Sequence, residues 1–421
     1  MTAHANGSRE QRQEHQSPRL YLDNAATSFP KPPAVHEAML RYATEIGASP
    51  GRGTYAESLE GARLLRDCRE RLSDLLGVSS PDHVIFTLNT SDALNLAIKG
   101  VVGHHRRTRP ASGEIHMVAT AMEHNSVLRP LNALAADGLA PKVTWTCVEA
   151  DAETGLINPA DVRAAIRPQT VLVAAVHASN VTGTLQPLAP LAEVAHAAGV
   201  PLLVDAAQSA GRVPIDMASL GIDLLAAPGH KSLLGPLGTG VLCMRPGLED
   251  HLDTIREGGT GTVSELDTQP DTLPDKYEPG SHNTLGIVGL REGVRWLLDR
   301  GVDALWADET ERISQLLEAL SDADRFPGLR LIGPPTIDDR VGVFTFVHEA
   351  ASPSEIARAL EHDHGILTRG GVHCAPRAHG TFGTRHAGGG LRISLGPFIT
   401  EADIERTLDA LAAVCRVPAG V

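Results

Sequence analysis

Short apolar runs alternate with helical stretches through the middle of the chain. The runs end in small or polar side chains and lie in the segments 83–100, 114–124, 142–150, 170–180, 200–211, 222–231 and 239–245. Several are apolar at nearly every position, as in parallel strands that helices cover on both faces. Helical candidates such as 187–199 lie between them. This alternation predicts an α/β fold with a mainly parallel sheet between helices.

The pattern changes after residue 285, where strand and helix candidates no longer alternate regularly. This change predicts a smaller C-terminal α+β domain. We therefore expect a large domain over 19–285, whose first residues pack on the small domain, and a small domain over 286–421. Residues 1–18 carry few apolar positions and predict a disordered tail. The segment 258–284, rich in Gly, Pro and Asp, predicts an ordered loop or linker.

Composition and charge exclude several classes of protein. The formal net charge is −14 and no run of Lys or Arg stands out, which argues against nucleic acid and anionic membranes as partners. No apolar stretch reaches about 18 residues and the N-terminus lacks the apolar core of a signal peptide, so we expect a cytoplasmic protein. The five cysteines are scattered without a CxxC pair and no HExxH motif occurs. Neither a disulfide framework nor a metal site is therefore expected.

Polar side chains follow several of the apolar runs, where open α/β sheets bind their ligands. Thr90 and Ser91 stand where a strand turns into a helix. Free backbone N–H groups make such a turn either an anion site or a plain helix cap. Asp205 ends another run; its carboxylate would either pair with a cation or cap a helix. Gln208 lies close enough in sequence to reach the same pocket.

Three further groups occupy similar positions. His230 and Lys231 follow a strand in a Gly- and Pro-rich turn. A lysine with a lowered pKa is a nucleophile, although a surface lysine in a loop is the plain alternative. His124 would stack on a flat cofactor, donate a proton or cap a helix. Asn180 is either a neutral hydrogen-bond donor or part of an Asx-turn.

These groups together match the needs of pyridoxal phosphate (PLP). That cofactor requires a held phosphate, an acid beside its pyridine nitrogen and a lysine for its aldehyde. An anion-binding turn, a histidine, an asparagine, an aspartate and a lysine follow one another at the strand ends. The combination predicts a PLP site with Lys231 as the residue that carries the cofactor.

At these residues the chain resembles the class V aminotransferase superfamily of fold-type I PLP enzymes, and within it the group II (SUF-like) cysteine desulfurase and selenocysteine lyase family. The matching motifs run from residue 21 to the C-terminal helix, about nine-tenths of the chain; they are YLDNAATSFPKP, SPGRGTY, TSDALNLAIKG, MEHNSV, HASNVTGT, VDAAQSAG, GHKSLLGPLGTG, EGGTGT, RGGVHCAP and LRISLG. The resemblance implies a fold-type I PLP-dependent transferase. It also implies a homodimer and a sulfur-acceptor protein as partners.

The resemblance assigns a role to each matching residue. In the cofactor site, Lys231 would carry PLP, Asp205 would bond its pyridine nitrogen and Gln208 its ring oxygen. His124 would stack on the ring and shuttle protons. The residues that would hold the phosphate are Thr90, Ser91, His230 and, from a second subunit, Ser281. The residues that would bind the substrate are Asn180 and Arg392, which would hold its carboxylate, and Arg369.

Cys374 determines the reaction that the resemblance implies. Residues 369–375 read RGGVHCA and match the RxGxHCA loop of group II desulfurases. In that family the loop cysteine takes the sulfur of L-cysteine, alanine leaves and an enzyme persulfide remains. Arg369 and His373 would help to keep the thiol ionised. The plain alternative is that Cys374 is an inert small residue in a turn.

The sequence departs from the family pattern at two positions. Pro228 stands where a hydroxyl residue usually contacts the phosphate, and Gly51 stands where the family often has a histidine before Arg-Gly. Other reactions on the same scaffold therefore stay open: selenocysteine lyase, another C–S lyase or an aminotransferase. A catalytically silent scaffold for a sulfur-relay partner is a further alternative.

Overall fold

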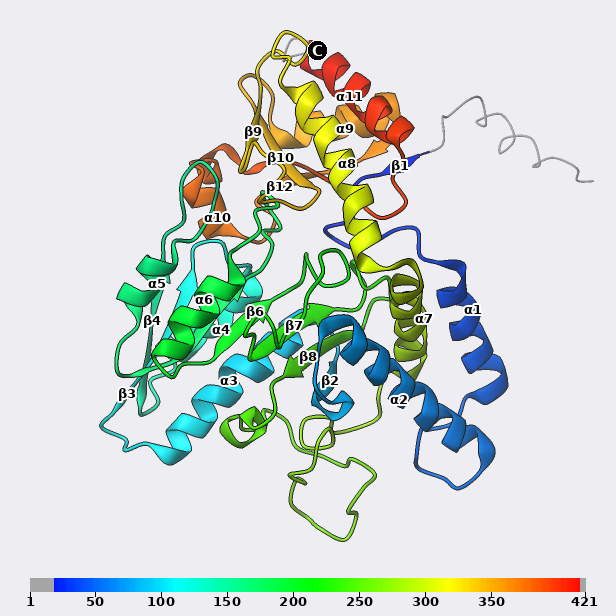
Figure 1. Ribbon diagram of the computed structural model, residues 1–421, viewed down its shortest axis with the longest axis vertical. Coiled ribbons are helices and arrows are strands. Elements are labelled where there is room, and N and C mark those ends of the chain that lie inside the picture. Colours follow the sequence, from blue (N-terminus) through cyan, green and yellow to red (C-terminus); the bar gives the residue numbers. More distant parts are fainter. Residues whose placement is uncertain (1–18, 417–421) are drawn as a thin grey trace, which may run out of the picture.

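A central sheet of seven strands forms the base of the molecule (Figure 1). The computed structural model describes residues 19–416, so the predicted tail over 1–18 lies outside the described residues. The strand order is β2-β8-β7-β6-β5-β3-β4, and within the described chain β8 alone runs antiparallel to its neighbours in this sheet. The strands are β2 (Val84–Thr87), β3 (Glu114–Thr120), β4 (Lys142–Val148), β5 (Thr170–Val176), β6 (Leu202–Asp205), β7 (Leu224–Pro228) and β8 (Gly240–Met244). Every predicted apolar run contains one of them, and the α/β fold class is confirmed.

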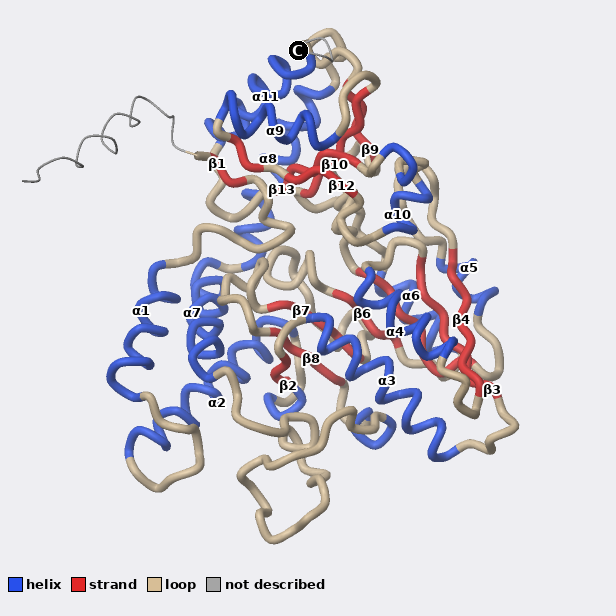
Figure 2. The backbone as a smooth tube through the Cα atoms, turned by 180° about the vertical axis from the view of Figure 1, so that it is seen from behind, coloured by secondary structure: helices blue, strands red, loops and turns tan. Residues whose placement is uncertain are grey.

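Helices cover both faces of this sheet (Figure 2). Alternate strand residues point to opposite faces, so Val204 packs into one apolar cluster and Leu203 into the other. The first cluster is completed by α2 (Ala56–Leu76), α5 (Pro159–Ala165), α6 (Leu188–Ala197) and α7 (Thr284–Arg300). The second is completed by α3 (Thr90–Thr108) and α4 (Asn125–Ala136). Burial on both faces explains why the strands read as continuous apolar runs.

A smaller antiparallel sheet lies above the large one (Figure 1). Its order is β12-β13-β10-β9. The N-terminal strand β1 pairs in parallel with β11, and Leu20 and Leu22 join the apolar cluster of this region. The elements are β1 (Leu20–Tyr21), α8 (Val302–Leu320), β9 (Leu329–Ile332), β10 (Val343–His348), α9 (Pro353–His364), β11 (Ile366–Leu367), β12 (Arg369–Gly371), β13 (Gly390–Ser394) and α11 (Glu401–Cys415).

The division into domains at 285/286 stays a prediction, and the packing favours a later division. Leu290 and Val294 of α7 lie in the core of the large sheet. Ile313 and Leu316 of α8 lie in the cluster of the small sheet. Gly301, with a φ of 79°, separates the two helices. Val302 and Leu305 still pack against the first core, so we propose that the change of core occurs within α8, after its first turn.

The remaining elements connect these two layers. They are α1 (Pro33–Arg41), the π-helix η1 (Tyr42–Ile46), the 3₁₀ helices η2 (Pro81–His83), η3 (Leu248–His251) and η4 (Arg385–Ala387), and α10 (Pro376–Thr381). Residues 257–283, all of them described, contain neither helix nor strand, in agreement with the predicted loop. No helix between residues 19 and 416 is long and apolar enough to cross a membrane.

A buried ion pair fixes the end of this long loop. Glu278 and Arg69 are each 5% exposed. Arg69 Nη1 donates to Glu278 Oε1 at 2.8 Å, and the same carboxylate oxygen accepts the Phe86 amide at 2.6 Å. Arg69 also donates to the Val84 carbonyl. The loop that carries Ser281 is thereby tied to α2 and to β2.

Replacing Glu278 by Gln should strongly destabilise the protein. The guanidinium of Arg69 would stay buried without its counter-charge, which costs about 3–5 kcal/mol. Urea unfolding measures this loss of free energy. The matched control is Glu60→Gln, which breaks the exposed pair with Arg63 and should cost about 1 kcal/mol or less. Equal losses in the two variants would contradict the assignment of Glu278 as the anchor.

Candidate functional site

A cavity of about 250 Å³ lies between the strand ends of the large sheet and the small domain. It brings together nearly all of the residues that the sequence singled out. Those lining it are Thr90, Ser91, His124, Asn180, Asp205, Gln208, Pro228, His230, Lys231, Arg369, His373, Cys374 and Arg392. Ser281 is the exception, because it lines a separate hollow beside Leu88 and Gly238.

Lys231 stands three residues after β7, in a turn that the N-terminal segment holds. Ser28 Oγ donates to the Lys231 carbonyl at 2.7 Å, and Lys31 Nζ donates to the His230 carbonyl at 2.7 Å. Burial lowers the pKa of Lys231 to about 8, although Asp205 acts in the opposite direction. A lysine with such a pKa has a substantial neutral, nucleophilic fraction near neutral pH.

Asp205 is the last residue of β6 and is 2% exposed. Its Oδ1 accepts the Ala207 amide at 2.9 Å. Burial raises the pKa of Asp205, whereas this hydrogen bond and Lys231 lower it. Gln208 belongs to the same wall, where its Nε2 donates to the Ala25 carbonyl at 2.9 Å. The cavity therefore contains a buried carboxylate at its floor and an amine in its wall.

His124 precedes α4 and is held in one tautomer. Its Nδ1 accepts the Ser126 amide at 3.1 Å, so the proton of the neutral ring lies on Nε2. Ser126 Oγ is 2.9 Å from the same Nδ1 and 2.6 Å from Ser91 Oγ. Burial, together with Lys231, lowers the pKa of His124 to about 4. Ser126 was not predicted from the sequence, although its place at a helix start, directly after His-Asn, was a usable signal.

The first turn of α3 and His230 line one part of the cavity. Asn89 caps the helix, because its Oδ1 accepts the Asp92 amide at 3.0 Å. Thr90 and Ser91 are therefore not the caps, and this plain alternative is wrong. His230 Nδ1 is buried without a hydrogen-bond partner among residues 19–416. In the tautomer that carries its proton on Nδ1, this nitrogen would be a free donor beside a helix N-terminus, which is well suited to an anion.

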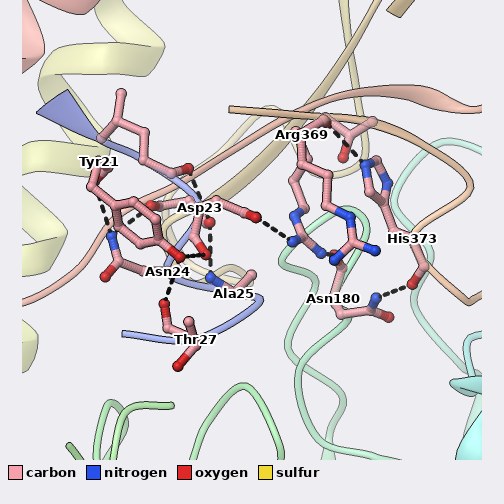
Figure 3. A network of polar contacts seen from close by, with 12 residues as sticks. Tyr21, Asp23, Asn24, Ala25, Thr27, Asn180, Arg369 and His373 are labelled. Carbon is pink, nitrogen blue, oxygen red and sulfur yellow. Dashed lines mark hydrogen bonds and ion pairs between the residues drawn. The ribbon is translucent and has the colours of Figure 1, made fainter. Parts of the chain in front are cut away.

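Arg392 of β13 is 2% exposed and lines the cavity. Asp23, Asn180 and Arg369, which belong to the polar network of this region, are labelled in Figure 3. Its Nη2 lies 2.6 Å from Asp23 Oδ1, and its Nη1 donates to the Asn180 carbonyl at 3.2 Å. Arg369 stands directly opposite Arg392 in the β12–β13 register. Asp23 was missed in the sequence, although it lies in the YLDNAAT motif. Two arginines and an amide thus converge on the cavity.

Cys374 lies on the loop between β12 and α10, with its side chain exposed. The Asn125 amide donates to the Cys374 carbonyl at 2.8 Å, and Asn180 Nδ2 donates to the His373 carbonyl at 2.6 Å. The ring nitrogens of His373 face Arg369 O and His379 instead. Both ring nitrogens of His373 are thus engaged away from the Cys374 thiol, and the help of His373 to the thiolate stays a prediction.

Glu123, directly before His124, is a titratable residue that the sequence reasoning missed. It is fully buried, and its Oε1 accepts Thr120 Oγ1 at 2.6 Å and the Val176 amide at 2.8 Å. Its Oε2 is buried with no hydrogen-bond partner in the described part of the chain. Burial raises the pKa of Glu123 to about 8, and Asp205 adds to the shift. Glu123 is therefore protonated at neutral pH and adds no negative charge beside Asp205.

The pH dependence of stability should reveal this proton. The folded state binds it more tightly than the unfolded chain, whose carboxyl has the ordinary pKa of 4.5. Stability conferred by Glu123 is thus complete below pH 4.5 and is lost as the pH rises toward 8, by up to about 1.4 kcal/mol per pH unit. In Glu123→Gln this loss disappears, so the variant should gain stability relative to wild type from pH 5 to pH 8.5.

Urea unfolding across that pH range measures the difference between the two proteins. The matched control is Glu153→Gln, a change at an exposed carboxyl on the surface, which should leave the slope unchanged. A difference between Glu123→Gln and wild type that stays constant with pH would contradict a protonated Glu123.

Comparisons with known proteins agree with this geometry. Residues 20–407 match the family model described as aminotransferase class-V. A probable cysteine desulfurase of Methanothermobacter thermautotrophicus is 32% identical over 401 residues, covering 94% of this chain and 95% of the relative. A cysteine desulfurase of Yersinia pseudotuberculosis is 30% identical over 407 residues, covering 96% and 95%.

Solved structures are similar over the same length. The apo structure of a cysteine desulfurase from Thermococcus onnurineus has a TM-score of 0.84 and 30% identity, with 94% of this chain and 95% of that chain covered. A cysteine desulfurase from Escherichia coli has a TM-score of 0.81 and 26% identity, with 94% of each chain covered. With a family match over nearly its whole length and relatives above 30% identity, the chain belongs to the aminotransferase class-V family.

Proposed function

We propose that the protein is a PLP-dependent cysteine desulfurase, which converts L-cysteine to L-alanine and takes the sulfur on Cys374. The observation that carries this proposal is the meeting of Lys231 and Cys374, from separate domains, at one small cavity. The relatives named cysteine desulfurase support it. The cytoplasmic location stays a prediction.

The residues of the cavity fit PLP. Asp205 offers a buried carboxylate for the pyridinium nitrogen, and Lys231 offers a nucleophilic amine for the aldehyde. The unpartnered His230 Nδ1, together with Thr90 and Ser91 at the start of α3, suits the phosphate. When bound, PLP supplies an electron sink for the carbon atoms of an amino acid. Gln208, three residues after Asp205, suits the ring oxygen.

Pro228 affects how the phosphate is held. It is the last residue of β7, lines the cavity and has neither a hydroxyl nor an N–H to donate. The phosphate therefore depends more strongly on His230 and on the first turn of α3. We assign the remaining contact to Ser281 of a second subunit, since the chain's own Ser281 lines another hollow. Leu88 and Leu237 are 55% and 69% exposed nearby, which supports a homodimer with apolar contacts at this place.

The remaining groups have separate tasks toward the substrate. Arg392 would bind the carboxylate of L-cysteine, because its planar fork pairs well with carboxylate oxygens, and Asn180 lies beside it. His124 holds a proton on Nε2 and would stack on the cofactor ring. Lys231, with a pKa of about 8, can hold or release a proton near neutral pH. The neutral Glu123 adds no negative charge beneath these groups.

Cys374 would accept the sulfur. Its thiolate attacks the sulfur of bound L-cysteine, so that an S–S bond forms while the Cβ–S bond breaks. The electrons of the broken bond stay with Cβ, which takes up a proton and becomes the methyl group of alanine. The sulfur is oxidised and the carbon is reduced, and the enzyme keeps a persulfide. A thiol of an acceptor protein would then remove that sulfur.

Replacing Lys231 by Ala should abolish covalent cofactor binding. We expect wild-type protein to show the visible absorbance of bound PLP, and we expect the label to map to Lys231 after borohydride reduction and peptide mass spectrometry. The control is Lys99→Ala, at an exposed position of α3, which should keep the absorbance. Labelling of another lysine in wild type would overturn the assignment.

Replacing Cys374 by Ala should lower alanine formation from L-cysteine by about two orders of magnitude. Substrate binding, followed through the change in visible absorbance, should persist because Arg392 is intact. The control is Cys147→Ala, at a partly buried cysteine of β4. Full turnover in Cys374→Ala would instead favour a lyase that needs no acceptor thiol, and it would overturn the desulfurase mechanism.

A further inference from the structure

A chain of hydrogen bonds leads from the Cys374 loop into the turn after α10. His373 Nε2 lies 3.2 Å from the Arg369 carbonyl, His379 Nε2 lies 3.3 Å from His373 Nδ1, and His379 Nδ1 lies 2.7 Å from Thr384 Oγ1. Carbonyl oxygens only accept, so His373 must donate from Nε2 and accept at Nδ1. His379 then donates from Nε2 and accepts the Thr384 hydroxyl at Nδ1. Each ring is thereby fixed in one tautomer.

The hydrogen-bond chain of His373, His379 and Thr384 is buried and uncharged. His373, His379 and Thr384 are 5%, 0% and 4% exposed. Burial lowers the pKa of His373 to about 3 and that of His379 to about 4. Each neutral imidazole both donates and accepts, which a protonated ring cannot do. The direction of the chain therefore persists across the physiological pH range.

The loop that this chain supports has an unfavourable backbone. His373 and Cys374 have φ angles of 50° and 58°, and left-handed backbone costs about 1–3 kcal/mol for each non-glycine residue. Such a conformation persists only where the surroundings hold it. The carbonyls of both residues are bound, by Asn180 and by the Asn125 amide, while the Cys374 side chain stays exposed. The loop thus fixes the backbone and leaves the thiol free.

Thr384, the last residue of this hydrogen-bond chain, lies in a turn that also packs against the Cys374 loop. Thr384 accepts the Gly389 amide at 3.0 Å through its carbonyl. A Cβ at Gly389 would lie 2.0 Å from the Gly371 carbonyl oxygen, so the turn over 384–389 packs directly against the start of the Cys374 loop. A change at Thr384 is therefore transmitted to Cys374 by two contacts, through the rings and through the backbone.

We propose that His373, His379 and Thr384 form a positioning relay that holds the Cys374 thiol in place for sulfur transfer. This inference rests on the proposed function for the role of the thiol, whereas the relay itself is a property of the fold. Without the Thr384 hydroxyl, His379 Nδ1 loses its donor, and the left-handed pair at His373 and Cys374 loses part of its support. The thiol then reaches the bound substrate less often, although the substrate still binds.

The test compares Thr384→Val, which removes the hydroxyl at nearly constant shape, with Thr384→Ser, which retains it. In the PLP-loaded enzyme we expect Thr384→Val to lower kcat for L-cysteine three- to ten-fold, about the effect of one buried hydrogen bond, with KM unchanged within about two-fold. Hydrogen exchange of the amides in 371–376 should rise by a similar factor. Thr384→Ser should keep both kcat and the exchange rates at the wild-type values. Thr381→Val, at a hydroxyl bonded within α10, is the matched control.

His379→Phe provides a second variant that removes both ring hydrogen bonds, and its effects should be at least as large as those of Thr384→Val. Unchanged hydrogen exchange and unchanged kcat in Thr384→Val would overturn the relay. Effects in Thr384→Ser as large as those in Thr384→Val would also overturn it. A different result would separate the two proposals. If hydrogen exchange rises in Thr384→Val but the wild-type enzyme releases no alanine from L-cysteine, the relay is supported and the proposed function is contradicted.

Discussion

Burial of the large sheet on both faces is the constraint on which the site depends. Its strands carry apolar side chains into two separate cores, where an unpartnered polar group would lose its hydration without compensation. Polar side chains such as Asp205 and Lys231 are therefore placed where strands end. The small sheet lies over this same edge and adds Arg392 and Cys374. One rigid base thus presents the groups suited to a cofactor, and a second layer presents those suited to a substrate.

The N-terminal segment joins the two layers at the site. Asp23 pairs with Arg392 of the small sheet, whereas Lys31 binds the His230 carbonyl in the large domain. Leu20 and Leu22 are buried in the cluster of the small sheet. These contacts come from a segment that turns at residues 24–26 and holds its own shape, for example through the Phe29 amide, which donates to Asn24 Oδ1 at 3.2 Å. Its value to the site lies in fixing the distance between the arginine and the lysine turn.

Continuous apolar runs were enough to predict the large sheet, because two-face burial removes the polar positions that would blur the pattern. The same reasoning predicted that Asp205, His124 and Lys231 meet, since the carboxyl ends of parallel strands share one edge. Pairs such as Arg69 with Glu278, 209 residues apart, could not be predicted, because no local pattern indicates which distant charges will be buried together. The sequence also did not indicate which sheet α7 packs against, because an amphipathic pattern predicts a buried helix face but not the surface that the face covers.

The parallel pairing of β1 with β11 joins Leu20 to Ile366 and has a consequence for synthesis of the chain. During translation, β1 leaves the ribosome long before its partner β11. Asp23 is likewise made long before Arg392, with which it pairs. The large sheet, complete by Met244, can assemble while the remainder is still being translated. The lysine turn is therefore translated early, whereas Arg392 and Cys374 come much later. A nascent chain accordingly has the cavity groups of the large sheet before it has Arg392 and Cys374, so the cavity is complete only after the C-terminal strands have been translated.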